Sequence, residues 1–320
     1  MLAFGPIPSR RLGRSLGINN IPPKICTYSC VYCQVGRTLK MQIERQAFYG
    51  PDELLKDVEK KIAEVRKAGA SIDYLTFVPD GEPTLDINLG REIDLLRLFG
   101  FKIAVITNAS LIWCHEVRND LMQADWVSLK VDAVNEEVWR KVNRPYRSLQ
   151  LSSILDGMLA FARIYKGELA TETMLVKGLN DSPEHAKEIA GFLAQLKPDK
   201  SYISIPIRPP AETWVKPPDE KAINVFYQIF NKKVKGVEYL IGEEGNAFAA
   251  TGNVAEDLLS ITAVHPMRKE AVRELLARAH ADASIIQQLI AQDLLFEAEY
   301  ENKKFYLRRF PVVNIKRIKL

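Results

Sequence analysis

Short apolar runs rich in β-branched residues alternate with longer amphipathic runs over most of the chain, and this alternation constrains the fold more than any other feature. Such a pattern is typical of parallel βα units, in which each helix returns the chain to the same edge of a sheet. The predicted strands cover residues 14–18, 74–78, 102–107, 126–131, 172–176 and 202–207. Six strand–helix pairs predict a sheet curled into a partial (β/α)6 barrel, within an α/β fold, rather than a complete eight-unit barrel.

The clearest predicted helix covers residues 52–68. Gly50 and Pro51 precede it, its apolar residues recur on one face, and Gly69 follows as a stop signal. Further helices are predicted over residues 88–99, 151–164 and 183–196.

The character of the sequence changes near residue 250. After a proline-rich stretch that reads as a loop, the chain shows three short helical patterns and then two strand patterns around a turn at Glu301 and Asn302. These elements are predicted over residues 257–263, 268–278, 284–293, 295–300 and 304–309. Three helices and a hairpin favour a winged helix, so we expect a barrel domain over 1–252 and a winged-helix-like domain with a basic tail over 253–320.

The composition is that of an ordinary globular protein, with 47% hydrophobic and 26% charged residues among 320. These values exclude disordered, collagen-like and disulfide-rich miniprotein classes. No apolar run approaches the ~18 residues of a membrane helix, and the N-terminal stretch lacks a signal-peptide core, so we expect a cytoplasmic protein without a membrane partner. The net charge of +4 is small, although residues 302–320 hold seven basic side chains and no acidic one.

Three of the four cysteines lie close together in the stretch CTYSCVYC, as Cys26, Cys30 and Cys33, while Cys114 stands alone and fits a small core residue. In a reducing compartment such tight spacing indicates a metal site. Three thiolates without a nearby fourth ligand suit a four-iron cluster that keeps one iron open. A zinc site remains an alternative on the residues alone.

The CTYSCVYC stretch resembles the CxxxCxxC signature of the radical S-adenosylmethionine (SAM) superfamily, including the aromatic residue Tyr32 before the third cysteine. The longer stretch GPIPSRRLGRSLGINNIPPKICTYSCVYCQVGRT is similar to a branch grouped with tRNA wyosine synthase-like iron–sulfur oxidoreductases, and the resemblance covers roughly residues 5–250. It implies a [4Fe-4S] cluster on Cys26, Cys30 and Cys33, with SAM on the fourth iron. It also implies a reductant such as flavodoxin or ferredoxin, and a 5′-deoxyadenosyl radical that abstracts hydrogen from a substrate.

The same resemblance extends to the loop after the second predicted strand. The sequence PDGEPTL is similar to the family's GGEP loop, with Gly81, Glu82 and Pro83 at matching positions and Asp80 in place of the first glycine. The resemblance implies that backbone carbonyls of this loop accept the methionine ammonium group of SAM.

Polar residues alternate along the sequence SLKVDA, which places Ser128, Lys130 and Asp132 on one face of a predicted strand. Inward polar residues cost free energy unless they bind something, so we expect a ligand at this strand. The resemblance implies that these three residues line the SAM or substrate pocket. Three partners stay open for Lys130: Asp132, the SAM carboxylate and the substrate. Asn108, at the end of the preceding strand, and Glu172, on the strand similar to the one near the adenine, complete the expected cofactor contacts.

Arginines form the last group of candidates. Arg10, Arg11 and Arg14 precede the cysteine motif, and Arg208 follows the sixth strand. The first three could clamp a phosphate or carboxylate of the substrate, or they could form salt bridges on the barrel rim, and the two interpretations carry equal weight. Arg208 lies at the strand end where such barrels bind ligands. The candidate catalytic residues are therefore Arg10, Arg11, Lys130 and Arg208, and the dispersed histidines receive no role.

The expected activity is hydrogen abstraction from a substrate that the sequence does not identify, with a tRNA base as the first candidate. The chain lacks the upstream cysteines of a second cluster, which argues against a wyosine synthase itself. The predicted recognition helix carries glutamines but no basic residue. RNA binding and protein docking are therefore two nearly equal interpretations of the C-terminal domain. The alternatives are radical modification or activation of a docked protein or peptide, and a non-enzymatic zinc- and nucleic-acid-binding module.

Overall fold

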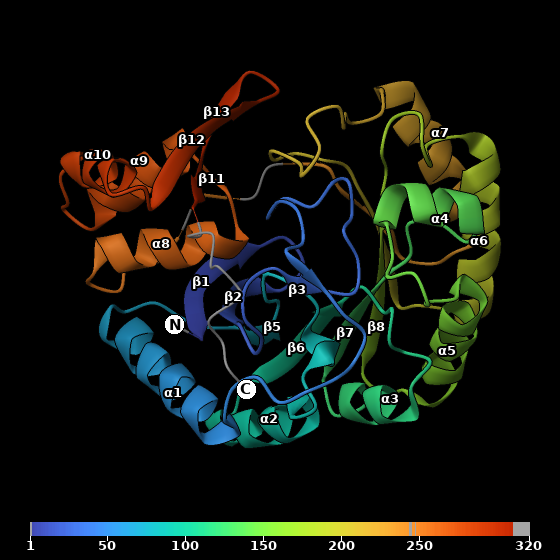
Figure 1. Ribbon diagram of the computed structural model, residues 1–320, viewed down its shortest axis with the longest axis horizontal. Coiled ribbons are helices and arrows are strands. Elements are labelled where there is room, and N and C mark those ends of the chain that lie inside the picture. Colours follow the sequence, from blue (N-terminus) through green and yellow to red (C-terminus); the bar gives the residue numbers. More distant parts are fainter. Residues whose placement is uncertain (1, 243–244, 247, 310–320) are drawn as a thin grey trace.

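A computed structural model describes residues 2–242, 245–246 and 248–309. Its main feature is an eight-stranded sheet with the strand order β1-β2-β5-β6-β7-β8-β9-β10, which curls around an open interior with helices on its outer face (Figure 1). Every neighbouring pair is parallel except β1 and β2, which are antiparallel. The curled mixed sheet confirms the predicted α/β partial barrel.

All six predicted strands are present. They are β2 (Gly13–Ile18), β5 (Tyr74–Phe77), β6 (Lys102–Thr107), β7 (Trp126–Lys130), β8 (Glu168–Met174) and β9 (Lys200–Ser204). Strands β8 and β9 begin and end earlier than predicted, because buried threonines and serines extend them where the sequence shows no apolar run.

Two further strands close the ends of the sheet, β1 (Ala3–Ser9) and β10 (Val237–Leu240). Strand β1 contains Pro6 and Pro8, which a central strand would not tolerate, and it lies at the edge of the sheet, where a missing N–H is acceptable. The prolines therefore hid this strand from the sequence pattern.

Helix α1 (Pro51–Lys67) matches its prediction and buries one apolar stripe, with acidic residues in its first turn and basic residues in its last. Helices α5 (Leu151–Ile164) and α6 (Pro183–Leu196) have the predicted bounds. The predicted helix 88–99 divides into α2 (Leu89–Leu96) and a 3₁₀ turn. The sequence pattern missed α3 (His115–Leu121), α4 (Glu136–Asn143) and α7 (Glu220–Asn231).

The C-terminal unit contains α8 (Val254–Val264), β11 (Met267–Arg268), α9 (Lys269–Arg278), α10 (Ser284–Ala291), β12 (Leu295–Tyr300) and β13 (Lys303–Arg308). The predicted three helices and hairpin are thus all present within residues 248–309, and β11 adds a short third strand beside β13. The part of the basic tail from 310 to 320 lies outside the described residues. Both the winged-helix assignment and the boundary at 252 stay predictions.

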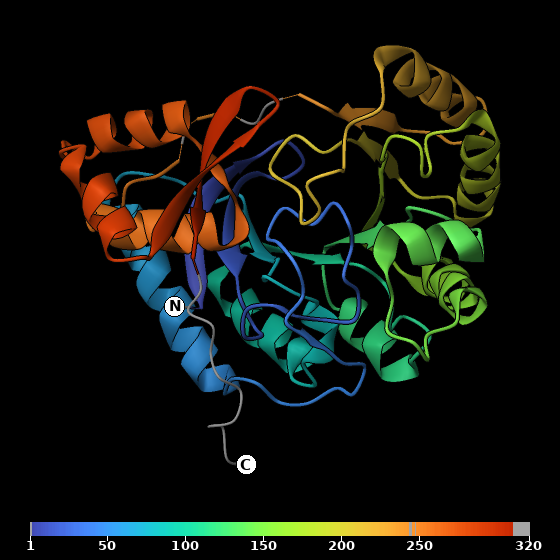
Figure 2. The same cartoon turned by 45° about the horizontal axis from the view of Figure 1, so that its top comes forward.

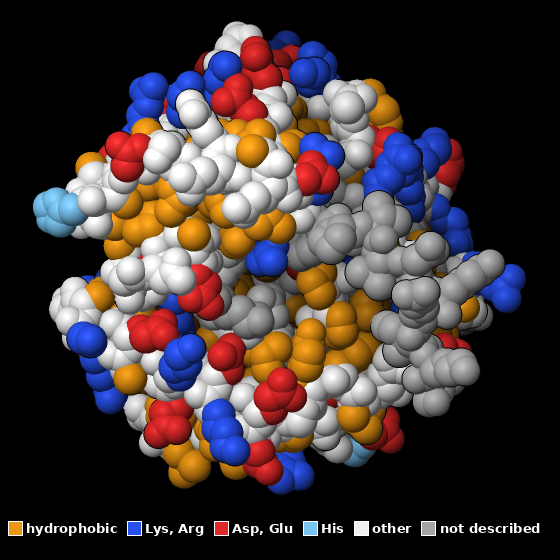
Figure 3. Space-filling view, turned by 60° about the vertical axis from the view of Figure 1, so that its left-hand side comes forward, with side chains coloured by type: hydrophobic (Ala, Val, Ile, Leu, Met, Phe, Trp, Pro, Cys, Tyr) orange, Lys and Arg blue, Asp and Glu red, His pale blue; other side chains and the backbone are white. Residues whose placement is uncertain are grey.

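Helix α8 lies along β1 and joins the C-terminal unit to the barrel (Figures 1 and 2). Phe4 of β1 packs with Ala263 and Val264 of α8. The Lys61 Nζ atom on α1 lies 3.2 Å from Asp257 Oδ1 on α8, and both side chains are buried. Figure 3 shows this side of the molecule, where hydrophobic side chains gather over the C-terminal unit.

None of the helices within residues 2–242, 245–246 and 248–309 has both the length and the apolar character of a membrane span.

A buried carboxyl group lies on α2 beside the loop that follows β5. Glu92 is fully buried, and neither of its side-chain oxygens has a hydrogen-bond partner among the described residues; the same is true of Asn20 Oδ1. Burial, together with the nearby charge of Asp86, raises the pKa of Glu92 to about 9. At neutral pH Glu92 is therefore protonated. The Nδ2 atom of Asn20 donates to the Pro83 carbonyl at 3.1 Å.

We expect Glu92→Gln to raise the free energy of unfolding at pH 8 and to change it little at pH 5. The pKa of Glu92 is about 9 in the folded state and ordinarily 4.5, so unfolding releases a proton between these two pH values. The free energy of unfolding of the wild type therefore falls as the pH rises. Glutamine has no such proton, so the advantage of the variant grows by up to about 1.4 kcal/mol per pH unit. Denaturant unfolding at several pH values measures it.

The matched control is Glu188→Gln on α6, where the glutamate is exposed. The stability of this variant should follow that of the wild type at every pH. A stability difference for Glu92→Gln that stays constant between pH 5 and pH 8 would contradict the buried, protonated state.

Candidate active site

The cysteine motif lies in a long loop between β2 and α1 that crosses the mouth of the sheet, between the C-terminal unit and α4 (Figures 1 and 2). Cys26 belongs to the short strand β3 (Ile25–Cys26), which pairs with β4 (Lys40–Met41). Tight turns follow, in which the Cys33 amide donates to the Cys30 carbonyl at 3.1 Å and the Gly36 amide donates to the Cys33 carbonyl at 3.1 Å. The backbone thus fixes the spacing of the three thiols.

All three cysteines line one cavity of about 340 Å³ at the carboxyl ends of the barrel strands, a volume within the usual range of small-molecule sites. Predicted site residues that share this lining are Arg10, Arg11, Tyr32, Gly81, Glu82, Asn108, Ser128, Lys130, Glu172 and Arg208. Pro83 and Asp132 lie outside the lining. The fold therefore brings most of the candidates to one enclosed space.

The surroundings of the thiols fit an iron–sulfur cluster. Asn108 Nδ2 lies 3.5 Å from Cys26 Sγ, and Asn143 Nδ2 lies 3.4 Å from Cys30 Sγ, so amides donate to two of the three sulfurs. Such donors stabilise ligating thiolates and tune a cluster. Burial raises the pKa of Cys30 to about 12, so metal binding must displace its proton.

Within the described part of the chain, no group of three or more His, Cys, Asp or Glu side chains is arranged to hold one metal ion. In a [4Fe-4S] cluster each thiolate binds a different iron, so a cluster does not require the three thiols to converge on one ion.

The loop of Gly81, Glu82 and Pro83, which we call the GEP loop, follows β5 and lies against the cysteine loop. Gly81 forms a parallel bridge with Ile25, and a Cβ atom at position 81 would overlap the Ile25 carbonyl oxygen. The buried Glu82 carboxylate accepts from the Thr107 hydroxyl at 2.5 Å and from the Asn108 amide at 2.8 Å. Glu82 thus fixes the loop to the end of β6, and Pro83 begins a buried 3₁₀ turn behind it.

Asp80, which departs from the family pattern, forms an ion pair that sequence reasoning missed. Its Oδ2 atom lies 3.2 Å from Lys24 Nζ, and both side chains are largely buried. Burial raises the pKa of Asp80 to about 6, although the Lys24 ammonium acts in the opposite direction. The charge of this loop therefore changes near neutral pH.

In another part of the cavity lining, the Glu172 carboxylate binds two cationic side chains. Lys130 Nζ donates to its Oε1 atom at 2.7 Å, Arg11 donates to its Oε2 atom, and the Ser204 hydroxyl donates at 2.9 Å. Burial alone would raise the pKa of Glu172, but Lys130 and Arg11 hold it well below its ordinary value. The observed ion-pair partner of Lys130 is thus Glu172, which was not among the three partners that the sequence left open.

Asp132 lies behind Tyr32 and positions it. The Tyr32 hydroxyl donates to Asp132 Oδ2, Asn143 Nδ2 donates to the same oxygen at 2.7 Å, and the Met174 amide donates to Oδ1 at 2.8 Å. These partners occupy the carboxylate, so its expected contact with a ligand in the cavity is not what the structure shows. Asp132 instead holds the Tyr32 ring, over which Lys130 Nζ lies at 5.4 Å from the centroid.

The arginines were expected either to clamp a substrate in the cavity or to form salt bridges on the barrel rim, and the structure contains examples of both positions. Arg10, which donates to the Gly242 carbonyl at 2.5 Å, and Arg11 both line the cavity. Arg14 forms an exposed salt bridge with Asp73 at 2.9 Å and lies outside the lining, so the rim interpretation holds for it. Arg208 donates to Gln34 at 2.5 Å and lies 3.1 Å from His265 Nε2.

His265 and Val264, at the end of α8, also line the cavity, although the sequence assigned no role to any histidine. No local signal could have identified them, because only the packing of α8 against β1 brings them to the barrel.

Comparisons with known proteins agree with this geometry. The family described as the radical SAM superfamily matches residues 20–193. The UPF0026 protein MJ1312 of Methanocaldococcus jannaschii is 50% identical over 309 residues, which cover 96% of each chain. A probable dual-specificity RNA methyltransferase RlmN of Picosynechococcus sp. is 34% identical over 245 residues, which cover 73% of this chain and 66% of the relative.

Two solved structures share the fold. A radical SAM methyltransferase from Sphaerobacter thermophilus superposes with a TM-score of 0.54 and 17% identity, covering 72% of this chain and 67% of the other. TYW1 with a lysine-pyruvate adduct bound gives a TM-score of 0.51 and 16% identity, covering 69% and 74%. Because the family matches more than half of the chain and the cysteines fit its cluster, this protein belongs to the radical SAM superfamily and uses a [4Fe-4S] cluster and SAM.

Proposed function

We propose that this enzyme cleaves SAM reductively and uses the product to abstract hydrogen from an RNA base, with tRNA as the first substrate to test. When bound, the cluster and SAM supply a 5′-deoxyadenosyl radical. The protein's own task is to hold both groups and the reacting base together and to keep water away from them.

One observation carries this proposal: three thiols, the GEP loop and a cationic wall of Arg11 and Lys130 around Glu172 line the same cavity. Cys26, Cys30 and Cys33 would hold the cluster, with Asn108 and Asn143 as sulfur donors. Gly81 and Asn108 are the proposed SAM neighbours on the thiol side, and Ser128 and Tyr32 share the cavity lining with them. Glu82, Pro83 and Asp132 act in this proposal by positioning these contacts.

The cationic wall of the cavity favours an anionic substrate. Arg11 and Lys130 share the single carboxylate of Glu172, so the triad keeps one net positive charge. Arg10 and Arg208 also line this cavity. A nucleotide carries a phosphate next to its base, which arginine binds with paired hydrogen bonds.

The relatives support RNA over a peptide. Several of them, including the relative from Picosynechococcus sp., are named as probable RNA methyltransferases. Deuterium transfer tests the two substrate classes directly, because hydrogen abstracted from substrate appears in 5′-deoxyadenosine. Incubation with SAM, dithionite and deuterated tRNA should label this product, whereas labelling only from deuterated protein would favour the docked-protein alternative.

We expect Cys30→Ser to abolish assembly of the cluster. Loss of outer-shell partners alone costs about 10- to 100-fold, so loss of a direct ligand should lower 5′-deoxyadenosine formation by at least about 100-fold. Anaerobic reconstitution, followed by visible absorption, iron and sulfide content and product analysis, measures the effect.

Cys114→Ser is the matched control, since Cys114 is half-buried at the start of α3 and outside the cavity lining. This variant should assemble the cluster normally. Equal iron and sulfide content in Cys30→Ser and wild type would contradict the assignment of the cluster to the three thiols.

We expect Arg11→Met to lower deuterium transfer from tRNA by about 10- to 100-fold, since a charge-assisted hydrogen bond is worth about 1.5–3 kcal/mol. Glu172 keeps Lys130 as its partner in this variant, so the wall retains its shape. SAM cleavage by dithionite in the absence of RNA should stay near the wild-type rate, and product analysis measures both quantities.

Arg14→Met provides the comparison, because Arg14 lies three positions away and pairs with Asp73 outside the cavity. Its transfer rate should equal that of the wild type. The cationic wall would lose its proposed role if the Arg11 and Arg14 variants transferred deuterium equally.

A further inference from the structure

The outer side of the cysteine loop carries a surface that the proposed function does not use. We define the loop-face surface as Arg37, Leu39, Arg144, Arg147 and Trp214, all exposed and all outside the cavity lining. Leu39 and Trp214 stand out, because these large apolar side chains are 62% and 51% exposed. Exposed apolar side chains among cations are typical of an interaction site and not of ordinary solvated surface.

Three segments that carry this surface are bound directly to the cysteine loop. The Thr38 hydroxyl donates to the Tyr28 carbonyl at 2.7 Å, and the Ser29 amide donates to the Asn143 carbonyl at 3.1 Å. The Glu212 amide donates to the Val31 carbonyl at 3.1 Å. A partner on the loop-face surface would therefore rest on the backbone that holds the thiols.

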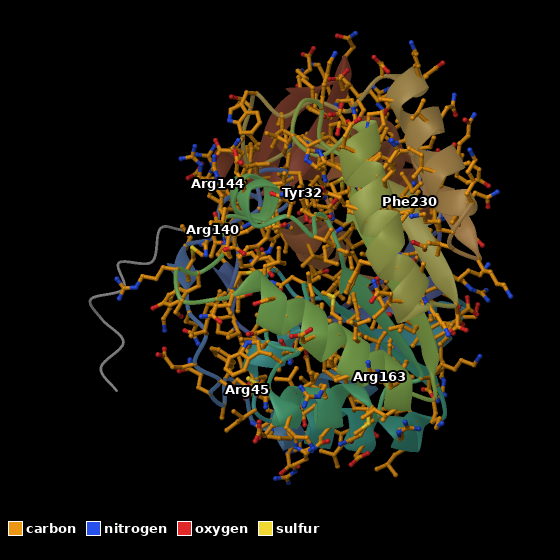
Figure 4. All side chains as sticks on the ribbon, turned by 90° about the vertical axis from the view of Figure 1, so that its right-hand side faces the viewer. Tyr32, Arg45, Arg140, Arg144, Arg163 and Phe230 are labelled. Carbon is orange, nitrogen blue, oxygen red and sulfur yellow. The ribbon has the colours of Figure 1, made fainter. Side chains whose placement is uncertain are left out.

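The route from this surface to the sulfurs is short. Arg144 directly follows Asn143, whose Nδ2 atom donates to Cys30 Sγ at 3.4 Å. Figure 4 shows Arg144 and Arg140 together on one side of the molecule near Tyr32, while Arg163 lies apart from them on α5. The loop-face surface is thus next to the cluster ligands, and its residues lie outside the cavity lining.

The surface has an excess of positive charge. Among its arginines, Arg37 and Arg144 share one carboxylate, Glu212, at 2.9 and 2.6 Å, and the Glu212 side chain is largely covered. The nearby acids of α4 are balanced within their own helix, since Glu136 pairs with Arg140 and Glu137 pairs with Lys141. An acidic partner would therefore meet complementary charge here.

We infer that the loop-face surface docks a small acidic electron-transfer protein of the flavodoxin or ferredoxin kind. The inference rests on the proposed function, because reductive cleavage of SAM requires one electron from outside. The carrier is oxidised by one electron, the cluster on the three cysteines is reduced by one, and no proton or covalent bond is exchanged. Complementary charge around a small apolar centre suits such a transient complex.

The test uses the reconstituted protein and purified flavodoxin. Arg147→Glu reverses one charge of the surface, and no ion pair is recorded for Arg147 among the described residues. We expect it to weaken flavodoxin binding about fivefold at low salt and less at high salt, because rim charges act through screened attraction. Calorimetric titration with oxidised flavodoxin gives the dissociation constant without any turnover.

Activity gives a second readout. SAM cleavage driven by reduced flavodoxin at low concentration should fall by the same factor in Arg147→Glu, while cleavage driven by dithionite should not change. Trp214→Ala should weaken flavodoxin binding at both low and high salt, because it removes apolar contact instead of charge. Arg163→Glu, the same change on α5, should match the wild type in every measurement.

Equal flavodoxin affinity in the Arg147 and Arg163 variants would overturn the inference. A parallel fall in dithionite-driven cleavage would also overturn it, since the change would then act on the cysteine loop. Weaker tRNA binding with unchanged flavodoxin binding would make this an RNA surface instead. If the wild type cleaved no SAM with dithionite, the proposed function would fail, whereas the binding titration would still test the surface.

Discussion

The backbone contact between the cysteine loop and the GEP loop holds the rest of the site together. The Lys24 amide donates to the Asp80 carbonyl at 2.7 Å, and the Glu82 amide donates to the Ile25 carbonyl at 3.2 Å. This close approach requires a glycine at position 81, where any side chain would meet the Ile25 carbonyl. From there Glu82 binds the Asn108 amide, and the Asn108 side chain reaches Cys26, so one contact sets the position of a thiol relative to two strand ends.

Charges inside the cavity are held before any ligand arrives. Glu172 balances Arg11 and Lys130 on one wall, and Lys24 balances Asp80 on the other. Burying these groups costs desolvation free energy, which opposite charges at hydrogen-bond distance offset only in part. Because the desolvation cost is already met on folding, these groups can stabilise charge in a reaction without reorganising. This advantage explains why the barrel holds charged side chains where a purely structural core would hold apolar ones.

Local pattern was sufficient for six of the eight barrel strands and for the three cysteines, but it could not give contacts between strands. Alternation placed Ser128 and Lys130 on the inward face, where both line the cavity. The partner of Lys130 is Glu172, directly opposite it in the β7–β8 register, and register depends on how whole strands align. Asp132 follows the end of β7, where the backbone turns its carboxylate to the Met174 amide, so alternation no longer applies there.

The C-terminal unit forms part of the cavity. Its helix α8 covers Phe4 of β1, and the chain that leaves α8 brings Val264 and His265 into the lining. Gln34, one residue after the third cysteine, and Arg208, after β9, both contact this segment, at 3.5 Å and 3.1 Å. A substrate that reaches the thiols must therefore fit between a barrel wall of fixed charges and a wall supplied by the C-terminal unit. The packing of α8 on β1 sets the distance between these two walls.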